Sequence, residues 1–282
     1  MLTYPFSQTI NANGKLLDLS KPKIMGIVNI TPDSFYDGGR YLLQERAIAH
    51  AEQLWAEGAD VLDLGAYSSR PGAEGISAQE ELDRLLPVLS EIRRRIPESI
   101  LSVDTFRASV AEAAVAAGAD IINDISGGYL DAAMHATVGK LQVPYILMHM
   151  RGTPETMQNL TNYKDLLYEM QVYFRDNIAK LRKEGVRDII LDLGFGFAKT
   201  LQQNYTLLKH LEDFKWFGLP ILGAVSRKSM IYRALNTSAE EALNGSTVLH
   251  TLLLLKGVQL LRVHDIQAVR EAVQLLDLYQ TS

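Results

Sequence analysis

The sequence predicts a single (β/α)8 barrel over residues 1–282, with a β-hairpin at its N-terminal end. Eight short apolar stretches alternate with longer segments whose apolar residues recur at helical spacing, the pattern of βαβ units around a parallel sheet. Short glycine turns join helix to strand, as in Glu57-Gly58-Ala59-Asp60 and Ala117-Gly118-Ala119-Asp120. The length of 282 residues also suits one barrel, which typically needs about 250 residues.

The hairpin is expected first, over Thr9 to Asp18, because Asn13-Gly14 is typical of a two-residue turn; it could cover the barrel bottom. The predicted strands are the eight apolar runs, at Lys23–Thr31, Val61–Ala66, Ile100–Thr105, Ile121–Ser126, Pro144–Met150, Ile189–Gly194, Pro220–Ser226 and Gln259–Asp265. The predicted helices lie between and after them, at Gln44–Glu57, Ala78–Arg95, Arg107–Ala117, Asp131–Lys140, Tyr163–Glu184, Leu201–Leu211, Ala239–Lys256 and Ile266–Tyr279. Eight such units close a barrel more readily than they extend an open sheet, and a doubly wound sheet is the alternative.

Composition excludes several classes of function. A net charge of −5 and a pI near 5.7 disfavour binding to nucleic acids or to acidic membranes, which requires a basic surface. The absence of cysteine excludes disulfides and thiolate metal sites. We expect no secretory signal at the start of the chain, and apolar runs such as Leu252–Leu255 are far too short to cross a membrane. We therefore expect a cytoplasmic protein with small-molecule ligands.

Polar residues occur at or near the C-terminal ends of the predicted strands, and two long loops follow the first two strands. In a barrel these strand ends line one mouth, so the polar groups would converge on a single pocket. The residues are Asn29, Asp63, Asp104, Asn123, His149, Asp192, Lys228, Arg262 and His264. The loops, Thr31–Tyr41 and Tyr67–Ser77, exceed the about 2–6 residues of an ordinary connection, and we expect both to close over substrate.

The chemistry of these groups indicates a flat heterocycle that carries an anion. Asp104, Asn123 and Asp192 can accept hydrogen bonds from the N–H donors of an aminopyrimidinone, although each could instead cap a turn. Lys228 could meet a ring carbonyl or nitrogen, or could be an idle surface lysine. Arg262 and His264 alternate in an apolar strand and would be costly there unless they meet an anion, for which a diphosphate is the obvious candidate.

Asn29 and the remaining histidines bear on metal binding. Asn29 offers an oxygen ligand to Mg²⁺, which usually takes the rest of its shell from water and phosphate. His50, His135, His210 and His250 fall in helical patterns and are expected to be structural or solvated. No zinc motif, nucleophile elbow or P-loop occurs.

Eight motifs, in order, resemble those of the dihydropteroate synthases. The first two are Asn29-Ile30-Thr31-Pro32-Asp33-Ser34-Phe35 with Asp37-Gly38-Gly39, and Ser68-Ser69-Arg70-Pro71-Gly72-Ala73. The others are Ser102-Val103-Asp104-Thr105, Asn123-Asp124-Ile125-Ser126, Met148-His149-Met150, Asp192-Leu193-Gly194-Phe195-Gly196-Phe197, Ser226-Arg227-Lys228-Ser229 and Arg262-Val263-His264-Asp265. The resemblance runs from Lys23 to the C-terminus.

The resemblance implies a transferase of folate synthesis that condenses 6-hydroxymethyl-7,8-dihydropterin diphosphate with p-aminobenzoate. By similarity the pterin would be held by Asp104, Asn123, Asp192 and Lys228, between Ile125 and Met148. Diphosphate and Mg²⁺ would be held by Asn29, Arg262 and His264, helped by Ser68 and Ser69. The aminobenzoate would lie among Phe35, Ser69, Arg70, Pro71, Phe197, Lys228 and Ser229. Catalysis is expected to depend on Lys228, Arg262, His264 and Asp104; a homodimer and sulfonamide sensitivity are also expected.

Some positions depart from the family pattern. Ala66-Tyr67-Ser68-Ser69 stands where Gly-Glu-Ser-Thr is common, and Leu193 and Ala198 stand where Pro and Gly are common. These changes bear on aminobenzoate and sulfonamide binding rather than on the reaction. Two other classes share the acidic pocket: a folate-dependent methyltransferase, which releases no diphosphate, and a non-catalytic pterin-binding protein. Arg262, His264 and the two long loops count against the methyltransferase.

Overall fold

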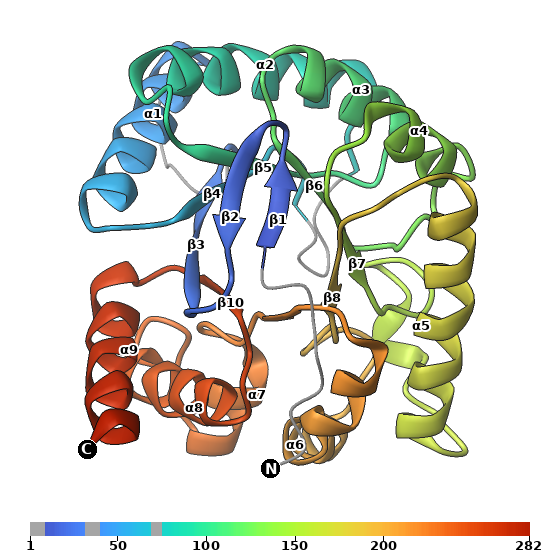
Figure 1. Ribbon diagram of the computed structural model, residues 1–282, viewed down its shortest axis with the longest axis vertical. Helices are drawn as coiled ribbons and strands as arrows, with labels where there is room; N and C mark the ends of the chain where they lie inside the picture. The colour runs from blue at the N-terminus through green and yellow to red at the C-terminus, as the bar shows by residue number, and fades with distance from the viewer. Residues whose placement is uncertain (1–8, 32–39, 69–74) are drawn as a thin grey trace.

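The computed structural model of the chain describes residues 9–31, 40–68 and 75–282. Within these ranges eight parallel strands close into a barrel in the order β10-β3-β4-β5-β6-β7-β8-β9, with helices around it (Figure 1). The strands are β3 (Lys23–Asn29), β4 (Val61–Gly65), β5 (Ile100–Asp104), β6 (Ile121–Asp124), β7 (Tyr145–Met148), β8 (Ile189–Asp192), β9 (Ile221–Gly223) and β10 (Leu260–Val263). The predicted barrel is confirmed, and the open doubly wound sheet is excluded.

Each predicted strand is present but shorter than predicted. Pro144 and Pro220 precede β7 and β9 because proline has no N–H to donate to a neighbouring strand. Their carbonyls still take part in the sheet, since Pro144 O accepts from Ile122 N at 3.0 Å and Pro220 O accepts from Leu191 N at 2.8 Å. At the other end, the polar residues after the strands belong to the loops of the barrel mouth.

The helices follow the predicted alternation. They are α1 (Arg40–Ala56), α2 (Ala78–Arg95), α3 (Ala108–Ala116), α4 (Met134–Leu141), α5 (Leu166–Lys183), α6 (Leu201–Lys209), α7 (Ser229–Leu235), α8 (Leu243–Leu255) and α9 (Ile266–Thr281), with short 3-10 helices η2 (Met157–Asn159) and η3 (Leu211–Phe217). The predicted start of α4 at Asp131 is too early because that carboxylate is used in a turn, where it accepts from Ala133 N at 3.0 Å and Ala108 N at 2.8 Å. Likewise α5 begins after Asp165, which caps it by accepting from Tyr168 N at 3.1 Å.

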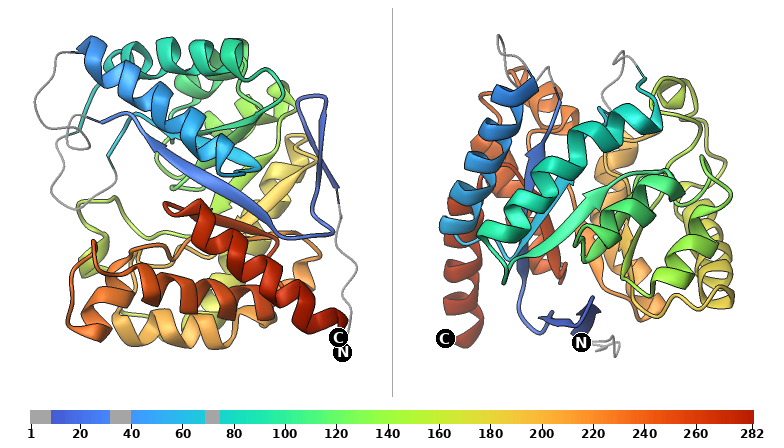
Figure 2. Two further views of the ribbon diagram at one scale, coloured as in Figure 1. Left: turned by 90° about the vertical axis from the view of Figure 1, so that its left-hand side faces the viewer. Right: turned by 90° about the horizontal axis from the view of Figure 1, so that it is seen from above.

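The N-terminal hairpin, β1 (Thr9–Ala12) and β2 (Lys15–Asp18), covers one end of the barrel as expected (Figure 2). Ile10 and Leu17 are buried in one cluster with Val61 and Ile100, which stand at the starts of β4 and β5. Burial of each such side chain stabilises the fold by about 1.5–3 kcal/mol. Lys15 also donates to Ser99 O at 2.6 Å. The hairpin therefore closes the bottom and leaves the opposite end for ligands.

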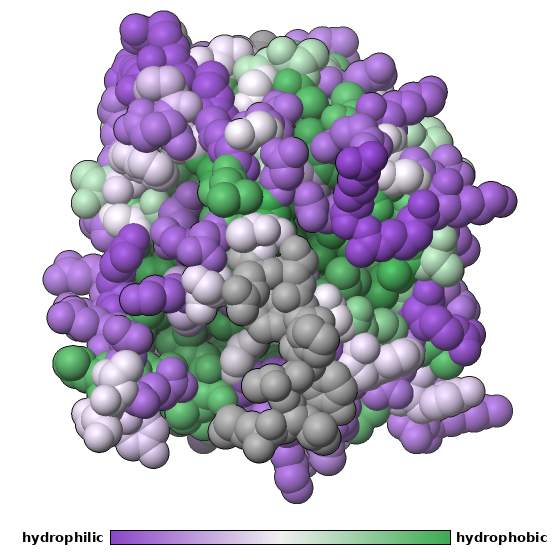
Figure 3. Space-filling view, viewed as in Figure 1, coloured by the Kyte–Doolittle hydropathy of each residue, from purple (hydrophilic) through white to green (hydrophobic). Residues whose placement is uncertain are grey.

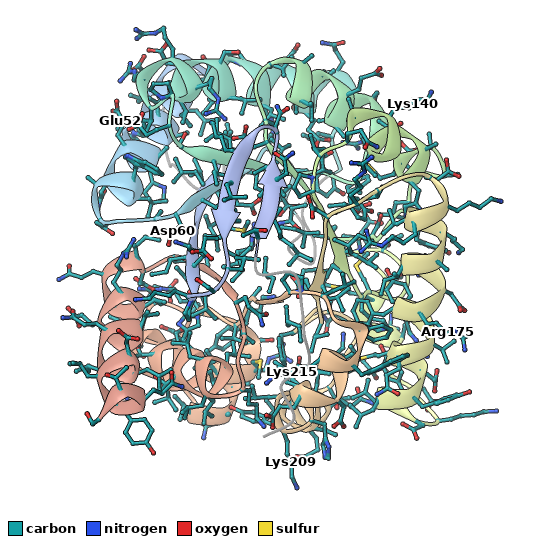
Figure 4. The ribbon with its side chains drawn as sticks, viewed as in Figure 1. Glu52, Asp60, Lys140, Arg175, Lys209 and Lys215 are labelled. Carbon is teal, nitrogen blue, oxygen red and sulfur yellow. The ribbon has the colours of Figure 1, made fainter. Side chains whose placement is uncertain are left out.

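Charged side chains lie mostly on the outside. Glu52 on α1, Lys140 on α4 and Arg175 on α5 occupy the outer ring of helices (Figure 4), and the outer parts of the face that carries the hairpin are mainly hydrophilic (Figure 3). In the described parts of the chain, no helix is both long enough and apolar enough to traverse a lipid bilayer.

His250 on α8 is buried, with 2% exposure, and neither ring nitrogen has a hydrogen-bond partner among the described residues. Burial lowers the pKa of His250 from 6.5 to about 4. As the pH falls below 6.5, His250 therefore becomes protonated in the unfolded chain, whereas in the folded chain it stays neutral until about pH 4. The contribution of this residue to stability falls as the pH falls through that range.

We expect His250→Leu to remove this acid sensitivity. Between pH 8 and pH 5 the wild-type chain should lose about 2 kcal/mol of unfolding free energy through His250, and the variant should not. Urea unfolding at the two pH values measures both losses. His210→Leu, which replaces an exposed histidine, should keep the wild-type loss. Equal losses in wild type and His250→Leu would contradict the assignment.

Candidate active site at the barrel mouth

The barrel brings together polar residues that are far apart in the sequence. Asp104 and Asn123 are direct neighbours in β5 and β6, and Met148 and Asp192 are direct neighbours in β7 and β8. Arg262, on β10, reaches the carboxylates of β4 and β5. The predicted convergence at one rim is thus observed for these residues.

A buried ion-pair network holds Arg262. Its Nε donates to Asp63 Oδ2 at 2.6 Å, and a second nitrogen donates to Asp104 Oδ2 at 3.0 Å. Asp63 is fully buried and also accepts from Ser102 Oγ at 2.6 Å and from Asn123 Nδ2 at 3.1 Å. Because three donors meet one carboxylate, Asp63 is a fixed anchor for Arg262 and for the Asn123 amide.

This network alters one step of the sequence interpretation. The burial of Arg262 does not require an external anion, because the chain itself supplies two carboxylates. The sequence pattern identifies Asp63 only as a polar residue near a strand end and does not predict its role as anchor. The signal was present in Val61-Leu62-Asp63-Leu64-Gly65, where an acidic residue interrupts a strand that is buried throughout. A charge in such a strand needs a partner.

Three acceptor oxygens remain at the mouth. Asp104 and Asn123 each keep Oδ1, and Asp192 keeps Oδ2, without a hydrogen bond to the described residues. The other oxygen of Asp192 accepts from Gly194 N at 2.8 Å, so the expected turn-capping role is real but uses only half of the carboxylate. Burial raises the pKa of Asp104 to about 7 and also raises the pKa of Asp192, while the nearby cations Arg262 and Lys228 oppose these shifts.

Lys228 stands at the N-terminal boundary of α7, and Ser229 is the first residue of that helix. Its Nζ donates to Phe195 O at 2.7 Å and lies 4.9 Å from the centre of the Phe197 ring. Burial lowers the pKa of Lys228 to about 8, against the charge of Asp192. The ammonium is therefore held at the mouth beside an aromatic face, and the idle surface lysine is excluded.

Apolar side chains form one wall of the mouth. Ile125, Met148 and Ala198 belong to one small buried cluster, against which Phe197 packs. Ala198 has φ 48°, in the left-handed region, where a Cβ costs about 1–2 kcal/mol. The structure thus explains why glycine is common at that position in the related motif. Leu193 is fully buried, and no further consequence of that departure is visible.

The remaining predicted site residues lie at the edge of the mouth or outside the described residues. Asn29 ends β3, and Ser68 is partly buried in the segment after β4. His264 is exposed just beyond β10, with its Nδ1 3.0 Å from Ser226 Oγ. The residues outside the described ranges are Phe35, Ser69, Arg70 and Pro71.

The described residues contain no group of three or more acidic or histidine side chains that could hold a metal ion by themselves. A single amide such as Asn29 fits a Mg²⁺ ion whose other ligands are water and substrate phosphate. Such an ion would arrive with its phosphate ligand rather than occupy a protein cage.

Comparison with known proteins agrees with this geometry. The family model described as pterin binding enzyme matches residues 25–264, which include seven of the eight barrel strands in full and β3 from Met25 onward. A (β/α)8 barrel with an acidic and cationic mouth and this family match defines a pterin-binding enzyme.

The curated relatives narrow the class. The dihydropteroate synthase of Escherichia coli is 41% identical over 268 residues, 94% of each chain, and that of Synechocystis is 41% identical over 97% of this chain and 93% of its own. The Xanthomonas albilineans dihydropteroate synthase structure with 4-aminobenzoic acid has a TM-score of 0.92 at 38% identity, covering 98% of this chain and 99% of its own. A Yersinia pestis dihydropteroate synthase with a sulfonamide drug has a TM-score of 0.91, also at 38% identity, covering 97% of this chain and 100% of its own. The chain belongs to the dihydropteroate synthase family, which confirms the predicted transferase of folate biosynthesis.

Proposed function

We propose that this chain joins the methylene carbon of 6-hydroxymethyl-7,8-dihydropterin diphosphate to the amino nitrogen of p-aminobenzoate. One observation supports this proposal above all: acceptor oxygens and cations lie together at the barrel mouth. The acceptors belong to Asp104, Asn123 and Asp192, and the cations are Lys228 and Arg262. Xanthomonas albilineans dihydropteroate synthase has been solved with 7,8-dihydropteroate, at 36% identity and a TM-score of 0.88. The proposed products are 7,8-dihydropteroate and diphosphate.

The pterin ring would use the free acceptors. Its amino and ring N–H groups would donate to Asp104, Asn123 and Asp192, and Lys228 would donate to a ring carbonyl or nitrogen. Ile125 and Met148 would face the flat ring, because both are buried in the apolar wall of the mouth.

In the reaction the C–O bond to diphosphate breaks, the C–N bond forms, and the amine nitrogen loses a proton to solvent. Negative charge grows on the leaving oxygen, where Arg262 and His264 would stabilise it, with help from Ser68 and Ser69. Positive charge grows on the pterin methylene, near the carboxylates. An arylamine is already a neutral nucleophile at pH 7, so no strong base is needed. Mg²⁺, with Asn29 as one ligand, would neutralise diphosphate charge when bound.

The aminobenzoate would lie beside Phe197, Lys228 and Ser229, which stand together where the loop after β8 meets the start of α7. Phe35, Ser69, Arg70 and Pro71 are proposed to complete this part of the site. A sulfonamide resembles p-aminobenzoate in shape and would compete for the same place.

The function is tested by measuring dihydropteroate and diphosphate together, with and without Mg²⁺. We expect equal amounts of both products, dependence on Mg²⁺, and a loss of about tenfold or more in kcat/KM for Asn29→Ala, since one metal ligand is removed. The Mg²⁺ concentration for half-maximal rate should rise in the variant. Turnover that needs no metal would remove this role of Asn29, and absence of both products would refute the proposed reaction.

We also propose a homodimer in the cytoplasm, formed through α8 and α9. Val248, Leu252 and Leu255 lie along one side of α8 with exposures of 40–52%, and Leu275 and Leu278 on the adjacent α9 are 68% and 59% exposed. Exposed apolar residues that are clustered in this way are typical of protein interfaces.

The assembly is tested by sedimentation equilibrium. Wild type should sediment as a dimer, and a variant with Leu252→Glu and Leu275→Glu should sediment as a monomer, because both charges would be buried in the interface. Leu16→Glu, at a 71% exposed position of the hairpin, should leave the dimer intact. A monomeric wild type would contradict the proposal.

A further inference from the structure

A buried lysine behind the mouth has no role in the site as described so far. Lys199 lies between β8 and α6 and is 5% exposed. Its Nζ donates to Gly194 O at 2.9 Å and to Phe197 O at 3.0 Å, and lies 3.1 Å from His149 Nδ1. An ammonium has three N–H groups, and here each has an acceptor. Burial lowers the pKa of Lys199 to about 7, which reflects the water contacts this group has lost. An apolar residue would avoid that cost, so packing alone does not explain the lysine.

The loop that Lys199 holds carries the contacts of two site residues. Gly194 N donates to Asp192 at 2.8 Å, and Phe195 O accepts from Lys228 at 2.7 Å. The Phe197 ring faces the Lys228 ammonium. These groups lie within or next to the segment bounded by the two carbonyls that Lys199 binds. The lysine therefore fixes the backbone that orients both Asp192 and Lys228.

The third acceptor ties the loop to β7. His149 is 3% exposed, and burial lowers its pKa well below the ordinary value, so the ring is neutral and its Nδ1 can accept from Lys199. Gly194 also packs directly on the residue after β7, since a Cβ at Gly194 would clash with His149 O. The loop is therefore held in one position, between the end of β7 and the side chain of Lys199.

We propose that Lys199 is a positioning residue that sets Asp192, Phe197 and Lys228 for binding the bicyclic ring, without touching substrate itself. This inference rests on the proposed pterin site. Replacing Lys199 by methionine removes the hydrogen-bond donors to Gly194 O and Phe197 O. The loop is then no longer held in position, and Asp192 loses its orientation.

The test is a double-mutant cycle in ligand binding. Calorimetry on the full chain measures the affinity for 6-hydroxymethyl-7,8-dihydropterin diphosphate with Mg²⁺ and without aminobenzoate. We expect binding about tenfold weaker for Lys199→Met, about 100-fold weaker for Asp192→Asn, and about 100- to 300-fold weaker for the double variant, because Lys199 acts mainly through Asp192 and only partly through Lys228 and Phe197. Multiplied losses, near 1,000-fold, would show that Lys199 acts elsewhere and would overturn the inference.

Two further variants separate positioning from stability. Val88→Ala, in the buried face of α2, should lower the free energy of unfolding by about 1–2 kcal/mol and leave ring affinity unchanged. Lys199→Gln, which keeps two N–H donors on a shorter side chain, should bind more tightly than Lys199→Met and more weakly than wild type, and serves if the methionine variant does not fold.

The controls also separate this inference from the proposed function. A folded Lys199 variant with wild-type affinity would overturn only the inference. A wild-type chain that fails to bind the pterin diphosphate would overturn the proposed site as well.

Discussion

Arg262→Met is expected to lower kcat/KM by about three orders of magnitude, because it removes a permanent cation from the place where the leaving group gains charge. The guanidinium is held there by Asp63 and Asp104 and is 19% exposed, so it meets ligand with its orientation already set. Burial alone would lower the pKa of Arg262, but the two carboxylates raise it, so the group is charged at neutral pH. Steady-state rates of diphosphate release measure the loss.

Arg93 offers a matched control for this substitution. Its side chain is 21% exposed and pairs with the buried Asp120 at 2.5 Å, much as Arg262 pairs with Asp63, but it lies at the barrel bottom beside Ser99 and Gly118. Arg93→Met should reduce stability and leave kcat/KM near wild type. Arg262→Lys should be intermediate, because one ammonium keeps the charge without the planar fork that spans two carboxylates. Similar kinetics for Arg93→Met and Arg262→Met would show that the effect is one of stability.

The fold was predictable because its signals are local. Apolar runs, glycine turns and the Asn13-Gly14 pair each depend on a few adjacent residues, and β3 to β10 follow them in order. The ends of elements were less predictable where a side chain competes with the backbone, as Asp131 does before α4. Such competition depends on a partner 23 residues away at Ala108, which the local pattern does not show.

The site was predictable as a set of residues and less so as a network. Polar residues at strand ends indicated which side chains would meet, because barrel geometry brings all strand ends together. The sequence could not show which group each polar side chain would bind. Arg262 could pair with substrate or with Asp63, and nothing in the sequence indicated that Lys199 is buried. Pairings of this kind depend on side-chain distances across the barrel, over 199 residues in the case of Asp63 and Arg262.

Asp63→Leu is expected to cost about 3–5 kcal/mol of unfolding free energy, the range for breaking a buried ion pair by removing one partner. The change leaves Arg262 with Asp104 alone and leaves the donors of Ser102 and Asn123 without their acceptor. Asp63→Asn should cost less, since an amide oxygen can still accept from part of this set. Urea unfolding at pH 7.5 measures each loss.

Adding Arg262→Met to Asp63→Leu should restore stability relative to Asp63→Leu alone, because the unpaired buried cation is removed together with its lost partner. The double variant should nonetheless remain as inactive as Arg262→Met, since methionine cannot stabilise the leaving group. Stability would then recover while activity does not, which separates the two consequences of a single ion pair. A double variant that is less stable than Asp63→Leu would mean that Arg262 is held chiefly by Asp104, and the anchoring role of Asp63 would have to be abandoned.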